Sequence, residues 1–518
     1  MTAVIPFDDI TAGLELLLSL DALIYLVAGL VGGFVVGVLP GFSGANAAAL
    51  VLGFSIGLPT EVALVLMAAI YAGASFAGAI PAILMNVPGT AGAAATALDG
   101  YPLAKQGKAE LAIGLARMSS TLGGVLAMMV IILVVGPLAQ LALGFGAREM
   151  FVVALFGLTV IAAVIGDSFR KGMVSALLGL LIAAMSASPL TGQPRFTFGF
   201  LGLYESVPFV PAIIGLFAVT QMLLLAPRER LLDPQVTQEL ASQKRGLKYQ
   251  LHELWDGIAS TLGHPWIVLR SSAIGVGLGC IPGIGTAVAN FISYGDAKRR
   301  AKNPEQFGKG AHEGIIASEA CDNAVTGGTM IPTFTLGIPG SATSAVMLAS
   351  LYLHGVQPGP RVMQTHAAEV YAVLGGLFVA SLLILPLGIL LATPMAQIIR
   401  FRPAVLVPVV LMLCFVGAFA VRNSLFDAGL ALVFGLLGVF LRTRGYPVVP
   451  LVLALILGPI AENNFMRALR LGNNDPLYFL QSPTALVMWS LFILTIATQV
   501  ISVLRRRRQR ESRAEVTA

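Results

Sequence analysis

The chain has little charge and almost no cysteine. Only 11% of its 518 residues are charged, 57% are hydrophobic, and the mean hydropathy is +0.86. This composition excludes an ordinary soluble protein and predicts a polytopic membrane protein. The three cysteines, Cys280, Cys321 and Cys414, are far apart and lack metal-ligand spacing, so neither a disulfide framework nor a metal site is predicted.

Basic residues are missing from the start of the chain, since no lysine or arginine precedes Lys105. The positive-inside rule therefore predicts that the N-terminus and the first loops lie outside the cytoplasm. The segment Met1–Leu20 has no basic n-region, so no cleavable signal peptide is expected. The tail Arg505–Arg510 is rich in arginine, which predicts a cytoplasmic C-terminus at the membrane surface rather than a nucleic-acid-binding patch.

Motifs for two other classes of membrane protein are missing or incomplete. No nucleotide-binding loop of the form G-x-x-x-x-G-K-[ST] is present, which argues against ATP-driven transport by this chain alone. Gly41–Gly44 spells the G-x-S-G of an intramembrane serine protease, but that chemistry needs a histidine at similar depth. All five histidines fall in loops or at the ends of predicted spans. No catalytic residue, and no enzyme activity, is predicted.

The strongest pattern is a Pro-Gly step that interrupts an apolar run four times, at 40–41, 88–89, 282–283 and 339–340. Proline removes a backbone donor and glycine accepts unusual dihedrals, so each step is expected to end a helix. The later step recurs 251 positions on, from 88 to 339, together with the preceding proline, from 81 to 332. The earlier step recurs after 242 positions. These offsets predict an internal duplication.

Basic residues predict that the two copies have opposite orientations. Lys298–Arg300 follows the Pro-Gly step at 282–283, whereas the matching loop near 57–61 has no basic residue. Lys105, Lys108 and Arg117 follow the step at 88–89, whereas basic content after 339–340 drops to Arg361. We therefore predict an all-α polytopic membrane protein with two inverted-topology repeats, helices that are re-entrant or discontinuous at the Pro-Gly steps, and about 11–12 membrane segments.

The predicted organisation has four parts. They are an N-terminal membrane repeat at 1–226, a cytoplasmic connector at 227–263, a C-terminal inverted membrane repeat at 264–483, and an extra final transmembrane helix with its basic cytoplasmic tail at 484–518. Two local features are also expected. Residues 22–57 form a re-entrant hairpin, with two tilted spans as the alternative, and Asp99–Lys108 forms a cytoplasmic loop.

The Pro-Gly steps are predicted to form a substrate site. Unwound backbone inside a bilayer is tolerated only where it lines a cavity or is buried in protein, and helix N-termini attract anions. The alternatives are simple kinking of the helices and polar side chains that only join helices. The candidate substrate-binding residues are Pro40, Gly41, Ser43, Asn46, Asn86, Pro88, Gly89, Pro282, Gly283, Gly285, Thr286, Pro339, Gly340, Ser341 and Thr343.

One helix face near the last step carries acidic residues. Glu319, Asp322, Asn323 and Thr326 stand at i, i+3, i+4 and i+7, so they share one face of a helix. Carboxylates inside a membrane are costly and usually mark ion or substrate pathways. We therefore predict that Glu319, Asp322 and Asn323 bind a coupling cation. The alternative is that these residues lie in the interfacial zone, where they are solvated and structural.

A series of short motifs occurs in a characteristic order along the chain. They are 39–41, 71–74, 83–89, 99–102, 281–285, 319–324, 337–341 and 357–360, for example Asp99-Gly100-Tyr101-Pro102 and Glu319-Ala320-Cys321-Asp322-Asn323-Ala324. In these motifs the chain resembles the large permease subunit of the tripartite tricarboxylate transporters, the TctA type. From about 366 onward only the hydropathy agrees. Leu98 and the segment Ala77–Ala79 depart from the family pattern, which leaves the substrate open.

The resemblance implies a secondary permease of the bacterial cytoplasmic (inner) membrane. It implies import of tricarboxylates or related organic acid anions by symport with Na⁺ or H⁺, without a bound cofactor. It also implies two partners, a small four-span membrane subunit of the TctB type and a periplasmic solute-binding protein of the TctC type. An ion channel, or another transporter that needs no binding protein, is the alternative function.

Overall fold

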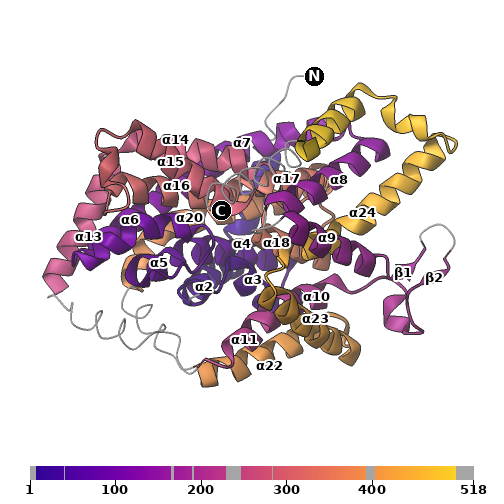
Figure 1. Ribbon diagram of the computed structural model, residues 1–518, viewed down its shortest axis with the longest axis horizontal. Helices are drawn as coiled ribbons and strands as arrows, with labels where there is room; N and C mark the ends of the chain where they lie inside the picture. Colours follow the sequence, from indigo (N-terminus) through magenta and orange to yellow (C-terminus); the bar gives the residue numbers. More distant parts are fainter. Residues whose placement is uncertain are drawn as a thin grey trace, which may run out of the picture. The chain divides into compact units, whose positions relative to one another are not determined.

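The computed structural model describes residues 7–39, 41–164, 169–188, 192–228, 247–282, 284–391 and 403–497. Within these ranges the chain is almost entirely helical (Figure 1). A short antiparallel pair, β1 (Ser186–Ala187) and β2 (Pro194–Arg195), is the exception, with Ser186 opposite Arg195. The predicted all-α class is confirmed.

Seven helices of the described residues are long and apolar enough to cross a membrane. They are α2 (Leu20–Gly37), the joined α4 and α5 (Thr60–Met85), α7 (Ala109–Ala142), α20 (Ala367–Leu390), α22 (Pro403–Arg422), α23 (Leu425–Thr443) and α24 (Val449–Leu471). Three shorter apolar helices span Phe209–Leu225, Ala342–Leu353 and Pro483–Ala497. A polytopic membrane protein is therefore confirmed, whereas the predicted number of segments stays a prediction.

The chain forms two compact units. Unit 1 comprises Met1–Ala142 and Pro208–Leu441, and unit 2 comprises Leu143–Val207 and Arg442–Ala518. This division reflects packing in space, whereas the predicted boundaries at 226, 263 and 483 concern repeats along the sequence. Those boundaries stay predictions. Residues 229–246 of the predicted connector and 498–518 of the predicted last helix and tail lie outside the described residues.

Unit 1 contains two series of helices in the same order. The first series is α1 (Phe7–Leu17), α2, α3 (Gly44–Leu52), α4 (Thr60–Ala77), α5 (Ala79–Met85), α6 (Ala93–Lys105) and α7, with the short helix η1 (Phe54–Gly57) after α3. The second is α13 (Leu247–Leu262), α14 (Pro265–Gly279), α15 (Gly285–Arg300), α16 (His312–Gly328), α17 (Met330–Leu336), α18 (Ala342–Leu353) and α20, with the short helices η4 (Pro304–Gln306) and α19 (Val362–Thr365).

The same neighbours recur in the two series. Helix α2 packs on α4, as α14 packs on α16, and α3 packs on α18, as α15 packs on α6. The two outer helices cross over between the series, since α1 packs on α20 and α13 packs on α7. Helices α5 and α17 begin and end 251 positions apart, and each is followed by a left-handed residue, Asn86 (φ 55°) and Gly337 (φ 68°).

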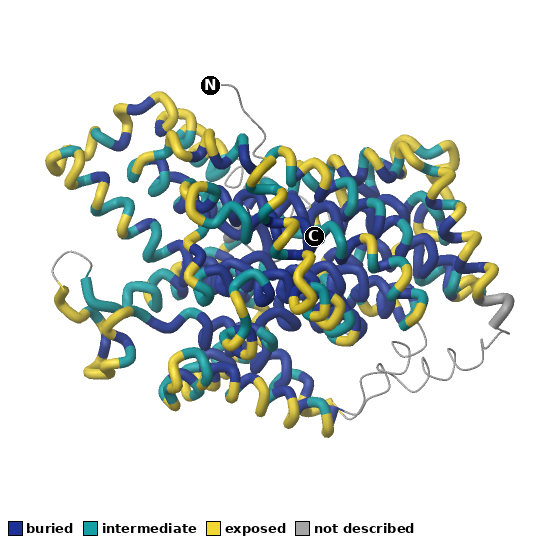
Figure 2. The backbone as a smooth tube through the Cα atoms, turned by 180° about the vertical axis from the view of Figure 1, so that it is seen from behind, coloured by how far each residue is buried: buried dark blue, intermediate teal, exposed yellow. Residues whose placement is uncertain are grey.

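Helices α4 and α16 form the centre of unit 1. The apolar window of Thr60–Met85 is completely buried, and every residue of α16 from Gly314 to Gly328 is buried. Figure 2 shows such buried stretches in dark blue, with exposed turns in yellow. Polar side chains on these two helices are therefore shielded from water and need partners inside the protein.

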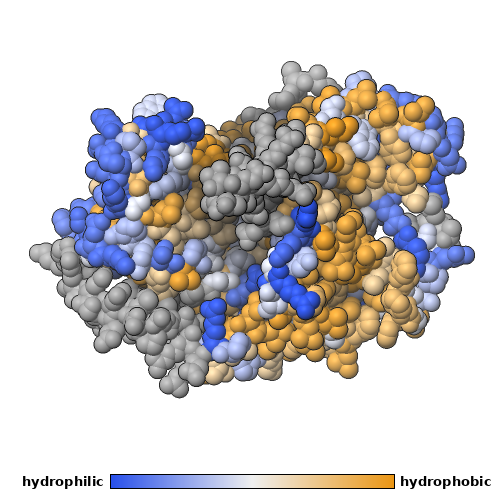
Figure 3. All heavy atoms as spheres, in the orientation of Figure 1, coloured by the Kyte–Doolittle hydropathy of each residue, from blue (hydrophilic) through white to orange (hydrophobic). Residues whose placement is uncertain are grey.

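Unit 1 also contains a group of three helical segments outside these two series. They are α22, α23 and the segment made of α10 (Phe209–Ile214), the π-helical η3 (Gly215–Val219) and α11 (Thr220–Leu225). The outer faces of α22 and α23 expose large apolar side chains, among them Met412 (68%) and Leu425 (80%). Figure 3 shows orange, hydrophobic spheres over these helices. Faces of this kind are typical of helices in contact with lipid.

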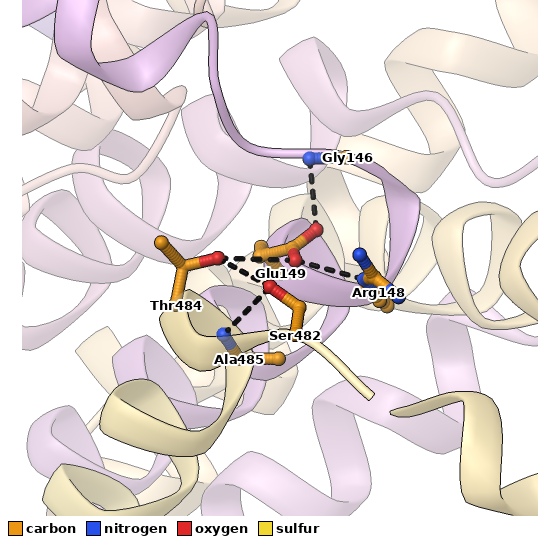
Figure 4. A network of polar contacts seen from close by, with 6 residues as sticks. All are labelled: Gly146, Arg148, Glu149, Ser482, Thr484 and Ala485. Carbon is orange, nitrogen blue, oxygen red and sulfur yellow. Dashed lines mark hydrogen bonds and ion pairs between the residues drawn. The ribbon is translucent and has the colours of Figure 1, made fainter. Parts of the chain in front are cut away.

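Unit 2 contains α8 (Ala147–Val164) and α9 (Phe169–Ala183), which pack on α24, and the short helices η2 (Leu201–Leu203) and η5 (Pro476–Leu480). The buried carboxylate of Glu149 joins the start of α8 to the start of the last described helix. It accepts hydrogen bonds from the Gly146 amide (2.9 Å), Arg148 Nε (2.9 Å) and Thr484 Oγ1 (3.2 Å), as Figure 4 shows. Arg195 forms an ion pair with Glu462 at 2.6 Å.

The predicted loop conformation of 99–108 is wrong as far as Lys105, because α6 continues to that residue, whereas the cytoplasmic location of the segment stays a prediction. Asp99 is completely buried, and its Oδ1 accepts hydrogen bonds from the amides of Gly308, Gly310 and Ala311. Tyr294 donates its hydroxyl proton to Asp99 Oδ2 at 2.9 Å. These contacts with distant residues stabilise α6 although Gly100-Tyr101-Pro102 is a sequence typical of a turn. Asp99 thereby fixes the loop before α16.

Candidate functional site

Two equivalent positions of the helix series meet at the centre of unit 1. Ser75 on α4 and Thr326 on α16 are 251 positions apart, and Thr326 Oγ1 donates a hydrogen bond to Ser75 Oγ at 3.4 Å. A position that contacts its own counterpart is what a local two-fold arrangement produces. The polar groups of the site surround this contact.

Two acidic residues of α16, Glu319 and Asp322, are buried among neutral donors. Asp322 Oδ2 accepts a hydrogen bond from Ser75 Oγ (2.7 Å), and Oδ1 accepts one from Asn290 Nδ2 (2.8 Å). Glu319 accepts from the hydroxyls of Thr96 and Ser120. Glu319 is 1% exposed and Asp322 is 2% exposed. Burial rules out the alternative in which these carboxylates are solvated at the membrane surface.

Two buried amide oxygens in this cluster have no donor. Asn290 and Asn323 use Nδ2 as donors, Asn290 to Asp322 and Asn323 to the Ser120 carbonyl at 3.2 Å. Their Oδ1 atoms are buried and have no hydrogen-bond partner. Carboxylate and amide oxygens are the ligands that hard cations prefer. The cluster therefore has the chemistry to bind a small cation or a proton.

The break between α17 and α18 lies next to α4. The hydroxyls of Tyr71 and Ser341 share a hydrogen bond at 2.9 Å, and Tyr71 also contacts Thr329 Oγ1 at 3.3 Å. Ser341 is the N-cap of α18, because its Oγ accepts from the Ser344 amide (3.1 Å) while Ser344 Oγ accepts from the Ser341 amide (2.8 Å). This capping box occupies the amide donors of Ser341 and Ser344, and leaves the amides at 342 and 343 open.

A second helix N-terminus lies beside the first. Ser43 caps α3 by accepting from the Asn46 amide at 3.4 Å. The side chain of Asn46 is completely buried, and neither its nitrogen nor its oxygen has a partner. A Cβ added to Gly44 would lie 3.2 Å from Thr343 Oγ1, so the first turns of α3 and α18 are in contact. An unpartnered buried amide in the first turn of α3, which contacts the N-terminus of α18, indicates a place where a polar ligand binds.

The glycines of the later Pro-Gly steps are required by close packing. A Cβ on Gly89 would lie 2.6 Å from the Gly37 carbonyl, and one on Gly340 would lie 3.0 Å from the Gly279 carbonyl. Gly37 and Gly279 are the last residues of α2 and α14, so the two breaks have the same environment in the two series. The Pro-Gly step at 88–89 is thus packed against the end of α2, which precedes the step at 40–41. The step at 339–340 is packed in the same way against the end of α14, which precedes the step at 282–283.

We expect Gly92→Ala to disrupt the acidic cluster. A Cβ at this position would overlap Asp322 Oδ1 and lie 2.7 Å from Asn290 Nδ2, so the hydrogen bond between them must break or the backbone must shift. The expected result is a destabilisation of about 1–3 kcal/mol, which thermal unfolding measures. Gly277→Ala on α14 is the control, because a Cβ there meets nothing within 4 Å. Equal unfolding temperatures for the two variants would contradict this.

The other predicted residues are less closely tied to the cluster. Pro40 and Gly283 lie outside the described residues. Asn86 is exposed and ends α5, Gly41 is exposed, and Gly285 and Thr286 are half-buried at the start of α15. Pro282, Pro339 and Gly340 are buried, whereas Pro88 is half-buried. Their assignment to substrate binding stays a prediction.

Several donors of the cluster were not among the predicted site residues. Thr96 and Ser120 bind Glu319, and Ser75 binds Asp322. One signal was available for Ser120, because Ser119–Thr121 is a run of three hydroxyl residues within a long apolar helix. Thr96 lies in an alanine-rich segment that gives no such signal, and only its position next to α16 identifies it.

Comparison with known proteins identifies the same family as the short sequence motifs. The model of the tripartite tricarboxylate transporter TctA family matches residues 23–453. An Agrobacterium vitis protein, described as an uncharacterized 52.8 kDa protein in the TAR-I ttuC' 3' region, is 30% identical over 497 residues, 96% of each chain. Another from the same organism, described as an uncharacterized protein in the TAR-II ttuC' 3' region, is 30% identical over 231 residues, 45% of this chain and 96% of that protein. No solved structure matches. The chain therefore belongs to the tripartite tricarboxylate transporter TctA family.

Proposed function

We propose that this chain is the large membrane subunit of a secondary transporter that imports tricarboxylates or related organic acid anions by symport with Na⁺ or H⁺. The observation that carries the proposal is one buried polar region in an apolar helical unit. It combines two carboxylates, Glu319 and Asp322, with two helix N-termini, those of α3 and α18. The family contributes the class of substrate and the transporter assignment.

The helix N-termini are proposed to bind the anion. The open amides at 342 and 343 and the unpartnered side chain of Asn46 are donors for a carboxylate. A helix N-terminus stabilises a negative charge by about 0.3–1 kcal/mol, and by up to ~2 kcal/mol in partly buried geometry. This is too little for a polyanion inside a membrane, so a co-transported cation at Glu319, Asp322 and Asn323 is proposed to supply the remaining compensation.

The two helix series are proposed to be inverted-topology repeats. Their matching packing partners and the contact between Ser75 and Thr326 support a two-fold relation. Helix α3 has nine residues, about 14 Å at 1.5 Å per residue, which is less than half of a bilayer core of about 30 Å. This supports a re-entrant hairpin of α2 and α3. The C-terminus is proposed to be cytoplasmic and the N-terminus periplasmic, in the inner membrane.

Labelling of single introduced cysteines tests the inversion. We expect cysteines at Lys105 and Lys298 to react from the cytoplasmic side, and cysteines at Gly57 and Arg361 to react from the outside. The wild-type cysteines Cys280, Cys321 and Cys414 are first replaced and uptake is checked. If Gly57 and Lys298 reacted from the same side, the repeats could not be inverted.

The proposed partners are a small four-span membrane subunit and a periplasmic solute-binding protein, as in the family's tripartite systems. Reconstitution tests this requirement. We expect uptake of labelled organic acid by vesicles that contain both membrane subunits only when the binding protein is added. Vesicles without the large subunit are the control. Flux that needs no binding protein would instead favour the ion-channel alternative.

A further inference from the structure

One buried cation in unit 1 has no ion-pair partner. Arg117, on the third turn of α7, is 1% exposed and is the largest fully buried side chain among the described residues. It is also the only lysine or arginine among their buried side chains. Its Nε and Nη1 atoms have no hydrogen-bond partner. The sequence grouped this residue with the cytoplasmic basic residues, and its burial separates it from Lys105 and Lys108.

The surroundings of Arg117 do not neutralise it. Its guanidinium carbon lies 5.9 Å from the centre of the Phe76 ring, and its Nε would lie 2.9 Å from a Cβ on Gly388 of α20. Glu110, two turns earlier on α7, acts on it only through space. The segment 392–402, which follows α20, contains no aspartate or glutamate. A buried charge without a fixed partner is costly for a fold, and arginines inside membranes usually mark function.

Arg117 shares α7 with a donor of the acidic cluster but is not paired with that cluster. Ser120, one turn further along α7, donates to Glu319, and Ser75, adjacent to Phe76, donates to Asp322. Each oxygen of the two carboxylates already accepts a hydrogen bond from a neutral donor. The acidic cluster therefore does not use the guanidinium, whose Nε and Nη1, on opposite edges, can each donate a hydrogen bond to a carboxylate oxygen.

We propose that Arg117 binds a carboxylate group of the transported anion. The inference rests on the proposed function and adds a residue to its substrate site. A substrate with two or three carboxylates exceeds what the N-termini of α3 and α18 can compensate, and the guanidinium supplies a full positive charge for one of them. The bound substrate thus supplies the ion-pair partner that the Arg117 guanidinium lacks in the free protein.

Uptake by the reconstituted complex with its binding protein tests this. The probe is whichever of labelled citrate, succinate and malate the wild-type complex takes up best. We expect Arg117→Gln to raise the KM for the probe at least tenfold. Arg117→Lys should restore part of the affinity, because lysine keeps the positive charge but lacks the planar array of N–H donors. Arg148→Gln is the matched control, since Arg148 is paired with Glu149 in unit 2. It should leave KM unchanged.

Thermal unfolding separates a substrate-binding role from a structural one. Because the unpaired charge is costly without ligand, Arg117→Met should unfold at the same or a higher temperature than wild type, and should lose the stabilisation that the probe anion gives. A lower unfolding temperature with the anion-induced shift retained would assign Arg117 to the fold. If wild type takes up the probe normally and Arg117→Gln has an unchanged KM, the role of Arg117 is overturned and the proposed function stands. If wild type takes up no organic acid, the proposed function itself is overturned.

Discussion

Replacing Gly340 by valine is expected to abolish uptake. A Cβ at this position would lie 2.9 Å from Thr329 Cβ and 3.0 Å from the Gly279 carbonyl, and valine adds two methyl groups to it. Overpacking of this kind costs about 1–3 kcal/mol when the protein relaxes around it. The relaxation must move the break between α17 and α18, and with it the cap at Ser341 and the open amides that follow.

The initial rate of uptake by reconstituted vesicles measures this effect, with the amount of folded protein determined by size-exclusion chromatography. Gly429→Val on α23 is the matched control, because a Cβ at Gly429 meets nothing within 4 Å. We expect the control to retain uptake. A folded Gly340→Val protein with a normal rate would mean that the break can move without consequence for substrate, and would refute its role in binding.

Replacing Glu319 by glutamine or Asp322 by asparagine is expected to change the cation dependence of uptake. The amides keep the shape of the side chains and one acceptor oxygen, but they remove a negative charge from a fully buried site. Losing about 1.4 kcal/mol of cation binding raises the half-saturating cation concentration tenfold, and an ionised ligand in a buried site contributes at least that much. The maximal rate at saturating substrate should fall less than the cation affinity.

The cation concentration that gives half-maximal uptake measures this effect. Glu149→Gln is the matched control, because Glu149 is also a buried, hydrogen-bonded carboxylate, but in unit 2. It should lower stability without a change in cation dependence. If Glu319→Gln and Asp322→Asn both folded and kept the wild-type cation dependence, the acidic cluster would be structural.

The sequence predicted the features of this protein that depend on local pattern. Hydropathy identified a helical membrane protein, and the shared offset of 251 positions identified α5 and α17 as equivalent helices. The spacing of Glu319, Asp322 and Asn323 predicted a common helix face, and all three side chains are buried at the centre of unit 1. The helical class and the common face were predictable because hydropathy and helix periodicity are readable without knowledge of packing, whereas the duplication stays a prediction.

Features that depend on distant contacts could not be predicted. The loop expected at 99–108 is helical because Asp99 binds amides at 308–311, about two hundred residues away in the sequence. Thr96 and Ser120 were missed because nothing in their own segments shows that Glu319 lies opposite. Arg117 was read as a marker of orientation, since only its burial and its open nitrogens set it apart from the loop lysines.

The proposed role of the Pro-Gly steps has also gained a second physical basis. The sequence predicts that glycine accepts the unusual dihedrals at which each helix ends, whereas the structure shows backbone packed against backbone at Gly89 and Gly340. Both reasons exclude a side chain, but they differ in consequence. Packing fixes the position of the N-terminus of α18, whose first turn contacts the first turn of α3, the helix that carries Asn46.

A cation gradient is expected to drive uptake of an organic acid anion through this chain. The initial rate of labelled citrate uptake is measured in vesicles with both membrane subunits and the binding protein, under an imposed inward Na⁺ gradient, an inward H⁺ gradient, or none. We expect accumulation above equilibrium with one of the two gradients, and collapse of the accumulated citrate when an ionophore dissipates that gradient. Uptake that only equilibrates, at the same rate under all three conditions, would contradict it.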